Sequence, residues 1–123
     1  MSAPAPACPF HLPLISILRG IRPEEALAHV QVLVEEGFDA IEIPLNSPEW
    51  ASSIGACVRE FGQQAWIGGG TVLRNVDVDR LVDLGVRFIV TPNTNPALIR
   101  HAVDRGLQVA PGFATASEAF AAL

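Results

Sequence analysis

Three residues of the sequence could do chemistry together: Arg19, Glu42 and Thr71. Glu42 stands between two isoleucines, and because neighbouring side chains of a strand point to opposite faces, its carboxylate should lie on the opposite face of a buried strand. Burying a carboxylate costs folding free energy unless the group is paired with a charge or takes part in a reaction. Two compatible roles follow: a general acid/base whose pKa is set by burial, or a buried ion pair with Arg19.

Glycines accompany the other two residues. Gly20 follows Arg19 and lets the backbone come close to a ligand, while the guanidinium suits a carboxylate or a phosphate. The run Gly68-Gly69-Gly70 precedes Thr71 and could present backbone N–H groups to an anion, although glycines at a strand end are also ordinary turn formers. These residues predict a site for an anionic small molecule.

Composition favours small-molecule chemistry over other functions. The chain has 123 residues, a net charge of -5 and eight basic residues that are scattered and all arginine, so neither a nucleic-acid footprint nor a membrane-surface patch is expected. No apolar run approaches the roughly 20 residues that a membrane span needs. Cys8 and Cys57 lack a metal-ligand spacing and predict free thiols in a reducing cytoplasm. We expect neither a metal nor a cofactor.

A βα repeat supplies the elements that must position these residues. Gly37, Gly62, Gly85 and Gly106 recur at intervals of 21 to 25 residues, each suited to a left-handed helix C-cap before an apolar run of strand length. The runs predict parallel strands at 14–18, 40–45, 65–68, 88–91 and 108–110. Helix starts are predicted at Ser47-Pro48-Glu49, at Asn95-Pro96 and at the capping box of Thr115 and Glu118.

These elements predict an α/β chain, a (β/α)8 TIM barrel of which about five strands and four and a half βα units are present. Residues 1–11 are expected to form a flexible tail and residues 12–123 the N-terminal part of the barrel domain. Two alternatives remain open. The chain could be a five-stranded flavodoxin-like binding domain, or a non-catalytic interaction fragment.

Four motifs carry a resemblance to a known family. The segments 12–20, 42–48, 68–72 and 90–93 resemble the 2-dehydro-3-deoxy-6-phosphogalactonate (2-keto-3-deoxy-6-phosphogalactonate) aldolases of the KDPG/KHG aldolase family, and the likeness runs from Leu12 to Leu123. A phosphogluconate/4-hydroxy-2-oxoglutarate aldolase of the same family is an alternative, but the related phosphogluconate aldolases typically carry an arginine-threonine pair where Asn46-Ser47 stand. The resemblance therefore favours the galactonate branch.

The resemblance implies a metal-free class I aldolase, usually a homotrimer, that releases pyruvate and D-glyceraldehyde 3-phosphate through a lysine Schiff base. Carried over by motif, Glu42 would be the proton donor and acceptor, Arg19 would bind substrate, and Thr71 would hold the pyruvate-side carboxylate. The family's lysine lies on the sixth strand, beyond Leu123, and the sequence contains no lysine. These 123 residues are therefore expected to be inactive alone.

Overall fold

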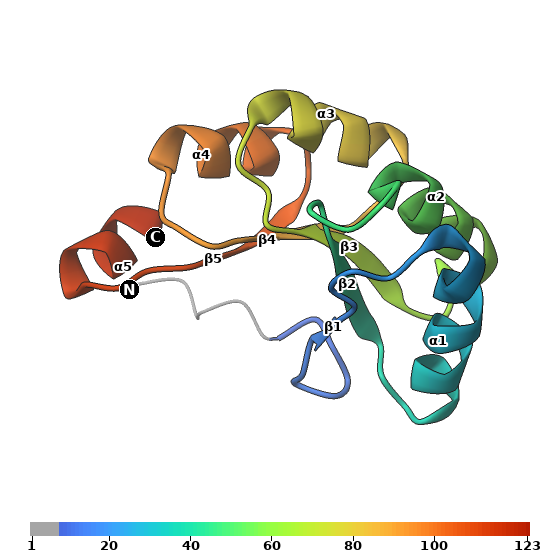
Figure 1. Ribbon diagram of the computed structural model, residues 1–123. Coiled ribbons are helices and arrows are strands. Elements are labelled where there is room, and N and C mark those ends of the chain that lie inside the picture. The colour runs from blue at the N-terminus through green and yellow to red at the C-terminus, as the bar shows by residue number, and fades with distance from the viewer. Residues whose placement is uncertain (1–7) are drawn as a thin grey trace.

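The computed structural model describes residues 8–123, and in them five parallel strands alternate with five helices (Figure 1). Each strand pairs with the next strand along the chain, in the order β1-β2-β3-β4-β5. The elements are β1 Ser16–Ile17, α1 Pro23–Glu35, β2 Ala40–Pro44, α2 Trp50–Phe61, β3 Trp66–Gly70, α3 Asn75–Asp83, β4 Phe88–Thr91, α4 Pro96–Asp104, β5 Gln108–Pro111 and α5 Ala116–Ala122.

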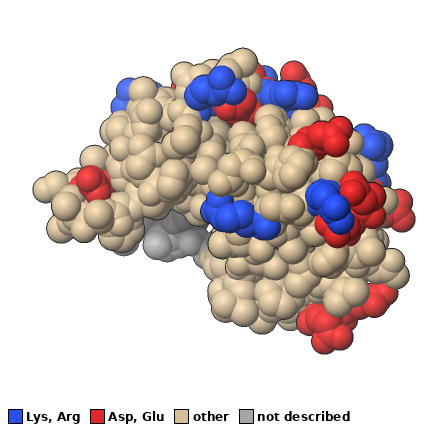
Figure 2. Space-filling view, viewed as in Figure 1, with Lys and Arg blue, Asp and Glu red and all other residues tan. Residues whose placement is uncertain are grey.

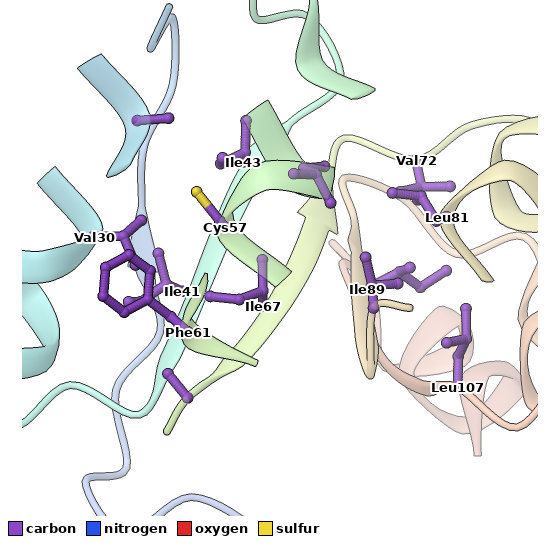
Figure 3. Close-up of a cluster of buried hydrophobic side chains, with 14 of the residues drawn as sticks. Val30, Ile41, Ile43, Cys57, Phe61, Ile67, Val72, Leu81, Ile89 and Leu107 are labelled. Atoms are coloured by element: carbon purple, nitrogen blue, oxygen red, sulfur yellow. The ribbon is translucent and has the colours of Figure 1, made fainter. Parts of the chain in front are cut away.

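The core lies between the sheet and helices on its outer side. Ile41, Ile43 and Ile89 are fully buried strand residues, and they belong to one cluster with Val30 of α1 and Leu81 of α3 (Figure 3). Because side chains alternate along a strand, the residues between these isoleucines point to the opposite, concave face. Burial of the isoleucines thus turns Glu42 toward the inside of the curved sheet.

The strand order excludes the flavodoxin-like alternative. That fold has the order 2-1-3-4-5 with helices on both faces of the sheet. Here the order is sequential, and Figure 1 shows α1 to α4 along the outer side of the strands. A sequential parallel sheet with its helices outside is the arrangement of a (β/α) barrel.

Strand boundaries and one glycine differ from the sequence predictions. β1 has only two residues, and β3 extends to Gly70 because the glycines continue the ladder with β2, in which Pro44 pairs with Gly70. Gly37, Gly85 and Gly106 do adopt positive φ, whereas Gly62 has a φ of -61°. Gly62 is the C-cap of α2 in a right-handed conformation, and its N–H bonds to the Val58 carbonyl, so the left-handed prediction was wrong there.

The start of α2 also differs. The helix begins at Trp50, and its N-cap is Glu49 with a φ of 46° and no side-chain cap bond. Ser47 was therefore wrongly predicted as a cap and Pro48 as the first helical residue. The other two starts are confirmed, because Asn95 accepts from the Leu98 N–H, and the last helix has the full capping box.

The predicted tail contains an ordered part. Residues 1–7 lie outside the described part of the chain. From Phe10 onward the segment contacts the sheet, with the Phe10 ring centroid 5.3 Å from that of Trp66 and the N–H groups of His11 and Leu12 donating to the Asp39 carboxylate. The segment expected to be flexible thus makes tertiary contacts before Leu12.

Candidate active site

The three predicted site residues come together at the carboxyl ends of β1, β2 and β3. Arg19 lies in the loop after β1, and its guanidinium reaches across to the other two loops. Its Nη1 donates to Asn46 Oδ1 at 2.9 Å and its Nη2 to Thr71 Oγ1 at 3.5 Å. A fixed guanidinium beside a hydroxyl is suited to bind a carboxylate or a phosphate oxygen.

Glu42 lies on the concave face, and only 2% of the residue is exposed. Its carboxyl group occupies the space over Gly70 of β3, where an added Cβ would overlap the carboxyl atoms. Gly68 similarly leaves room for the ring of Phe88. Gly68 and Gly69 pair with strands on both sides, so their backbone groups belong to the sheet. The glycines therefore make space for side chains, a role that sequence reasoning did not assign to them.

Burial raises the pKa of Glu42 from an ordinary 4.5 to about 7, and the positive charge of Arg19 partly opposes that rise. Oε2 of this carboxyl has no hydrogen-bond partner among the described residues. Glu42 and Arg19 do not form the ion pair that was the other predicted role. The Arg19 guanidinium bonds to Asn46 and Thr71, and its charge acts on Glu42 without a direct hydrogen bond. A carboxyl with a pKa near neutrality can both give and take a proton.

Thr71 has a strained backbone. Its φ of 55° lies in the left-handed region, which is uncommon for a β-branched residue and costs on the order of 1–3 kcal/mol. The chain beyond it is tied to the sheet by the Val72 N–H, which donates to the Val90 carbonyl. This conformation ends β3 abruptly and leaves the Thr71 hydroxyl within reach of Arg19.

Asn46 and Ser47 are site residues whose roles sequence reasoning missed. Asn46 holds the Arg19 guanidinium, and the buried Ser47 hydroxyl accepts the N–H of Gly20 at 2.9 Å. Together they join the loop after β1 to the loop after β2. A signal was available, because polar residues directly after a parallel strand of a barrel stand at the end where active sites form.

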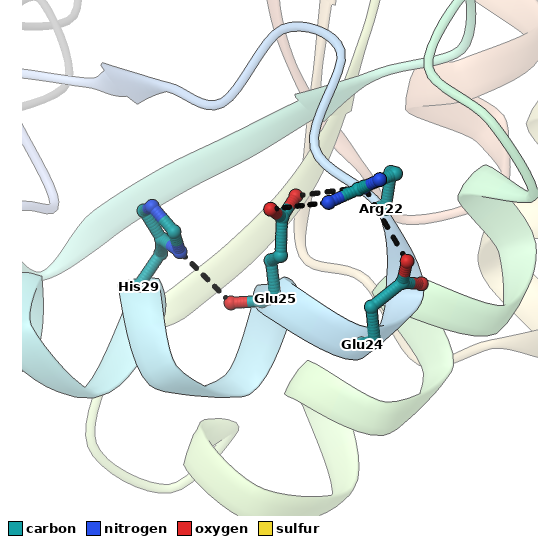
Figure 4. A network of polar contacts seen from close by, with 4 residues as sticks. All are labelled: Arg22, Glu24, Glu25 and His29. Carbon is teal, nitrogen blue, oxygen red and sulfur yellow. Dashed lines mark hydrogen bonds and ion pairs between the residues drawn. The ribbon is translucent and has the colours of Figure 1, made fainter.

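Several charged residues outside the site form ion pairs at the surface. Arg22 donates to Glu25 at 2.8 Å and lies 3.3 Å from Glu24, while His29 contacts the Glu25 carbonyl (Figure 4). Such exposed pairs contribute little to stability. Figure 2 shows basic side chains interspersed with acidic ones on that face.

Residues 8–123 contain neither a metal-binding cluster nor a membrane-spanning helix. No group of three or more His, Cys, Asp or Glu side chains is placed to hold a metal ion there. None of the helices in this range has the length and apolar character needed to cross a membrane.

The raised pKa of Glu42 has a consequence for stability. A carboxyl whose folded pKa exceeds its unfolded pKa destabilises the fold once the unfolded state is ionised. Stability is therefore complete below about pH 4.5 and falls as the pH rises to about 7, by about 3 kcal/mol in all. Urea unfolding of the wild type and of Glu42→Gln from pH 4.5 to 8 measures this loss. Equal pH dependence of the two proteins would contradict it.

A sequential parallel sheet with outer helices, and a buried carboxyl with a pKa of about 7 on its concave face, are the features of a barrel enzyme. The family model for KDPG and KHG aldolases matches residues 10–123. The chain therefore belongs to the KDPG and KHG aldolase family, whose members are carbon-carbon lyases.

Similar proteins agree with that assignment. The chain is 58% identical to 2-dehydro-3-deoxy-6-phosphogalactonate aldolase of Escherichia coli, and the aligned region covers 91% of this chain and 55% of the relative. It is 50% identical to a probable 2-dehydro-3-deoxy-6-phosphogalactonate aldolase of Rhizobium meliloti, covering 95% and 55%. A solved native KDPGal structure matches with a TM-score of 0.90 and 57% identity, over 91% of this chain and 54% of the other. The chain thus spans about half the length of the curated relatives it matches, and the predicted fold is confirmed.

Proposed function

We propose that this chain is part of a class I aldolase that cleaves 2-dehydro-3-deoxy-6-phosphogalactonate into pyruvate and D-glyceraldehyde 3-phosphate. The observation that carries the proposal is the buried Glu42 carboxyl, which has a pKa of about 7, is influenced by the charge of Arg19, and has an oxygen without a hydrogen-bond partner among the described residues. Proton transfer by one such carboxyl serves both formation of a Schiff base and protonation of the enamine that follows cleavage.

The proposed roles follow from the chemistry of each group. Glu42 gives and takes the proton at the carbinolamine and enamine stages. Arg19 binds the anionic substrate, and the Thr71 hydroxyl donates to the carboxylate on the pyruvate side. The electron sink requires a primary amine that arginine cannot replace, and the sequence contains no lysine. The amine therefore comes from outside these 123 residues, and no metal or cofactor takes part.

The galactonate substrate is favoured over the gluconate epimer by two observations. Both phosphogalactonate relatives share at least half of the aligned residues. Asn46, which stands where the gluconate branch typically has arginine, accepts a hydrogen bond from Arg19 in this site. By the same family resemblance we propose that the complete enzyme is a homotrimer of the cytoplasm.

Borohydride trapping with pyruvate tests the proposed mechanism. The 123-residue chain should form no stable pyruvyl adduct, apart from reaction at its α-amino group, because it lacks the lysine nucleophile. A fusion of this chain to the complementary part of the E. coli relative should be trapped and should cleave the phosphogalactonate substrate. Mass spectrometry locates the adduct. An internal adduct on the 123-residue chain would contradict the lysine requirement, and preference of the fusion for the gluconate epimer would contradict the substrate assignment.

A further inference from the structure

The segment before β1 crosses the amino ends of the strands and is pinned there. The N–H of Leu12 donates to Asp39 Oδ1 at 3.3 Å, and the N–H of His11 donates to the other oxygen of that carboxylate. Asp39 directly precedes β2, so the segment is fastened to the strand that carries Glu42. These two bonds place the ring of Phe10 against the sheet.

Phe10 completes a layer of three aromatic rings. Its ring centroid lies 5.3 Å from that of Trp66, in an edge-to-face arrangement, and 5.6 Å from that of Phe88. The Arg87 guanidinium lies over the Trp66 ring, 3.9 Å from its centroid. Trp66 and Phe88 are the first residues of β3 and β4, so the layer occupies the amino end of the sheet.

The aromatic layer adjoins the level of the sheet at which Glu42 lies. Glu42 pairs with Gly68, and Gly68 pairs in turn with Phe88, so the three residues stand at one level across neighbouring strands. The Phe88 ring fills the space over Gly68, and the Glu42 carboxyl fills the space over Gly70. No β3 side chain separates them, because both inward positions beyond Trp66 are glycine.

We infer that Phe10 is a positioning residue for the proposed proton transfer: it closes the amino end of the barrel interior and keeps water away from the Glu42 carboxyl. The inference rests on the proposed function for its catalytic meaning. Loss of the ring would open a path for water below Phe88 and reduce the desolvation that raises the pKa of Glu42. The charge that acts on Glu42 is that of Arg19, in the loop at the opposite end of the strands, and it is unchanged by substitution at Phe10.

Carbon-13 NMR titration of the Glu42 carboxyl in the 123-residue chain tests this inference. Phe10→Ala should lower the pKa of Glu42 by about one unit, since partial solvation restores part of the ordinary value. Phe10→Leu, which keeps an apolar side chain at the position, should leave the pKa near that of the wild type. Phe61→Ala is the matched control, because it removes a buried aromatic ring from the outer core, away from the concave face.

The outcomes separate the inference from the proposed function. An unchanged pKa in Phe10→Ala, or an equal fall in Phe61→Ala, would overturn the closing role of Phe10 while leaving Glu42 as the proton carrier. A wild-type pKa at the ordinary 4.5 would instead remove the observation that carries the proposed function. Dispersed amide spectra of each variant establish that it is folded.

Discussion

Glu42→Gln in the fusion to the complementary part of the E. coli relative is expected to lower kcat by roughly 10²- to 10⁴-fold, with a much smaller change in KM. Glutamine has the shape of the carboxyl but cannot exchange a proton, whereas Arg19 and Thr71, the proposed binding groups, are unchanged. Steady-state kinetics with the phosphogalactonate substrate measures the change.

Glu25→Gln is the control for that experiment. Glu25 is an exposed carboxylate of α1 that pairs with Arg22 and makes no hydrogen bond to Arg19, Glu42 or Thr71, so kcat should stay near the wild-type value. A near-normal kcat for Glu42→Gln would show that the buried carboxyl has a structural role only.

Glu42→Gln should also unfold at a higher urea concentration than the wild type at pH 8, since the cost of a buried charge is removed.

The second large effect is expected from Gly70→Ala. The added methyl group would overlap the Glu42 carboxyl, and because Glu42 is buried its side chain has little free space into which to move. We expect loss of about 1–3 kcal/mol of stability and a fall in kcat of at least about 10²-fold, because the carboxyl must leave its position. Chemical denaturation and kinetics of the fusion measure the two effects.

A double-substitution cycle isolates the cause. Glu42→Ala removes the overlapped atoms, so Gly70→Ala should cost far less stability in that background than in the wild type. Gly55→Ala in α2 is the matched control, because its added Cβ would meet only the flexible ends of Arg59 and Leu84 at 3.3 Å. Additive effects of the two substitutions would refute steric overlap as the cause.

The parts of the site that sequence reasoning located depend on local rules. The burial of Ile41 and Ile43 determines where Glu42 points, and alternation along a strand is visible in three residues. Arg19 and Thr71 were found because each follows an apolar run at the end where barrel sites form. The capping box at Thr115 is equally local, and it was predicted correctly.

The parts that were missed depend on contacts between distant segments. Ser47 precedes a proline and a glutamate, which is the local pattern of an N-cap, but its hydroxyl is taken by the Gly20 N–H from another loop. The Ala/Pro-rich beginning of the chain indicated a tail, yet Phe10 packs on Trp66, 56 positions later in the sequence. Gly70 was interpreted as a backbone feature, whereas it is required by the side chain of Glu42.

The sequential strand order has a consequence for synthesis on the ribosome. Every strand of the described sheet after β1 pairs with its predecessor, so each closure spans one βα unit rather than the whole chain. At translation rates of about 5–20 residues per second, a new unit of roughly 23 residues emerges every one to five seconds. Each nascent unit can dock on a finished partner before the next one leaves the exit tunnel. Assembly can therefore proceed vectorially from the amino end, without waiting for a distant strand.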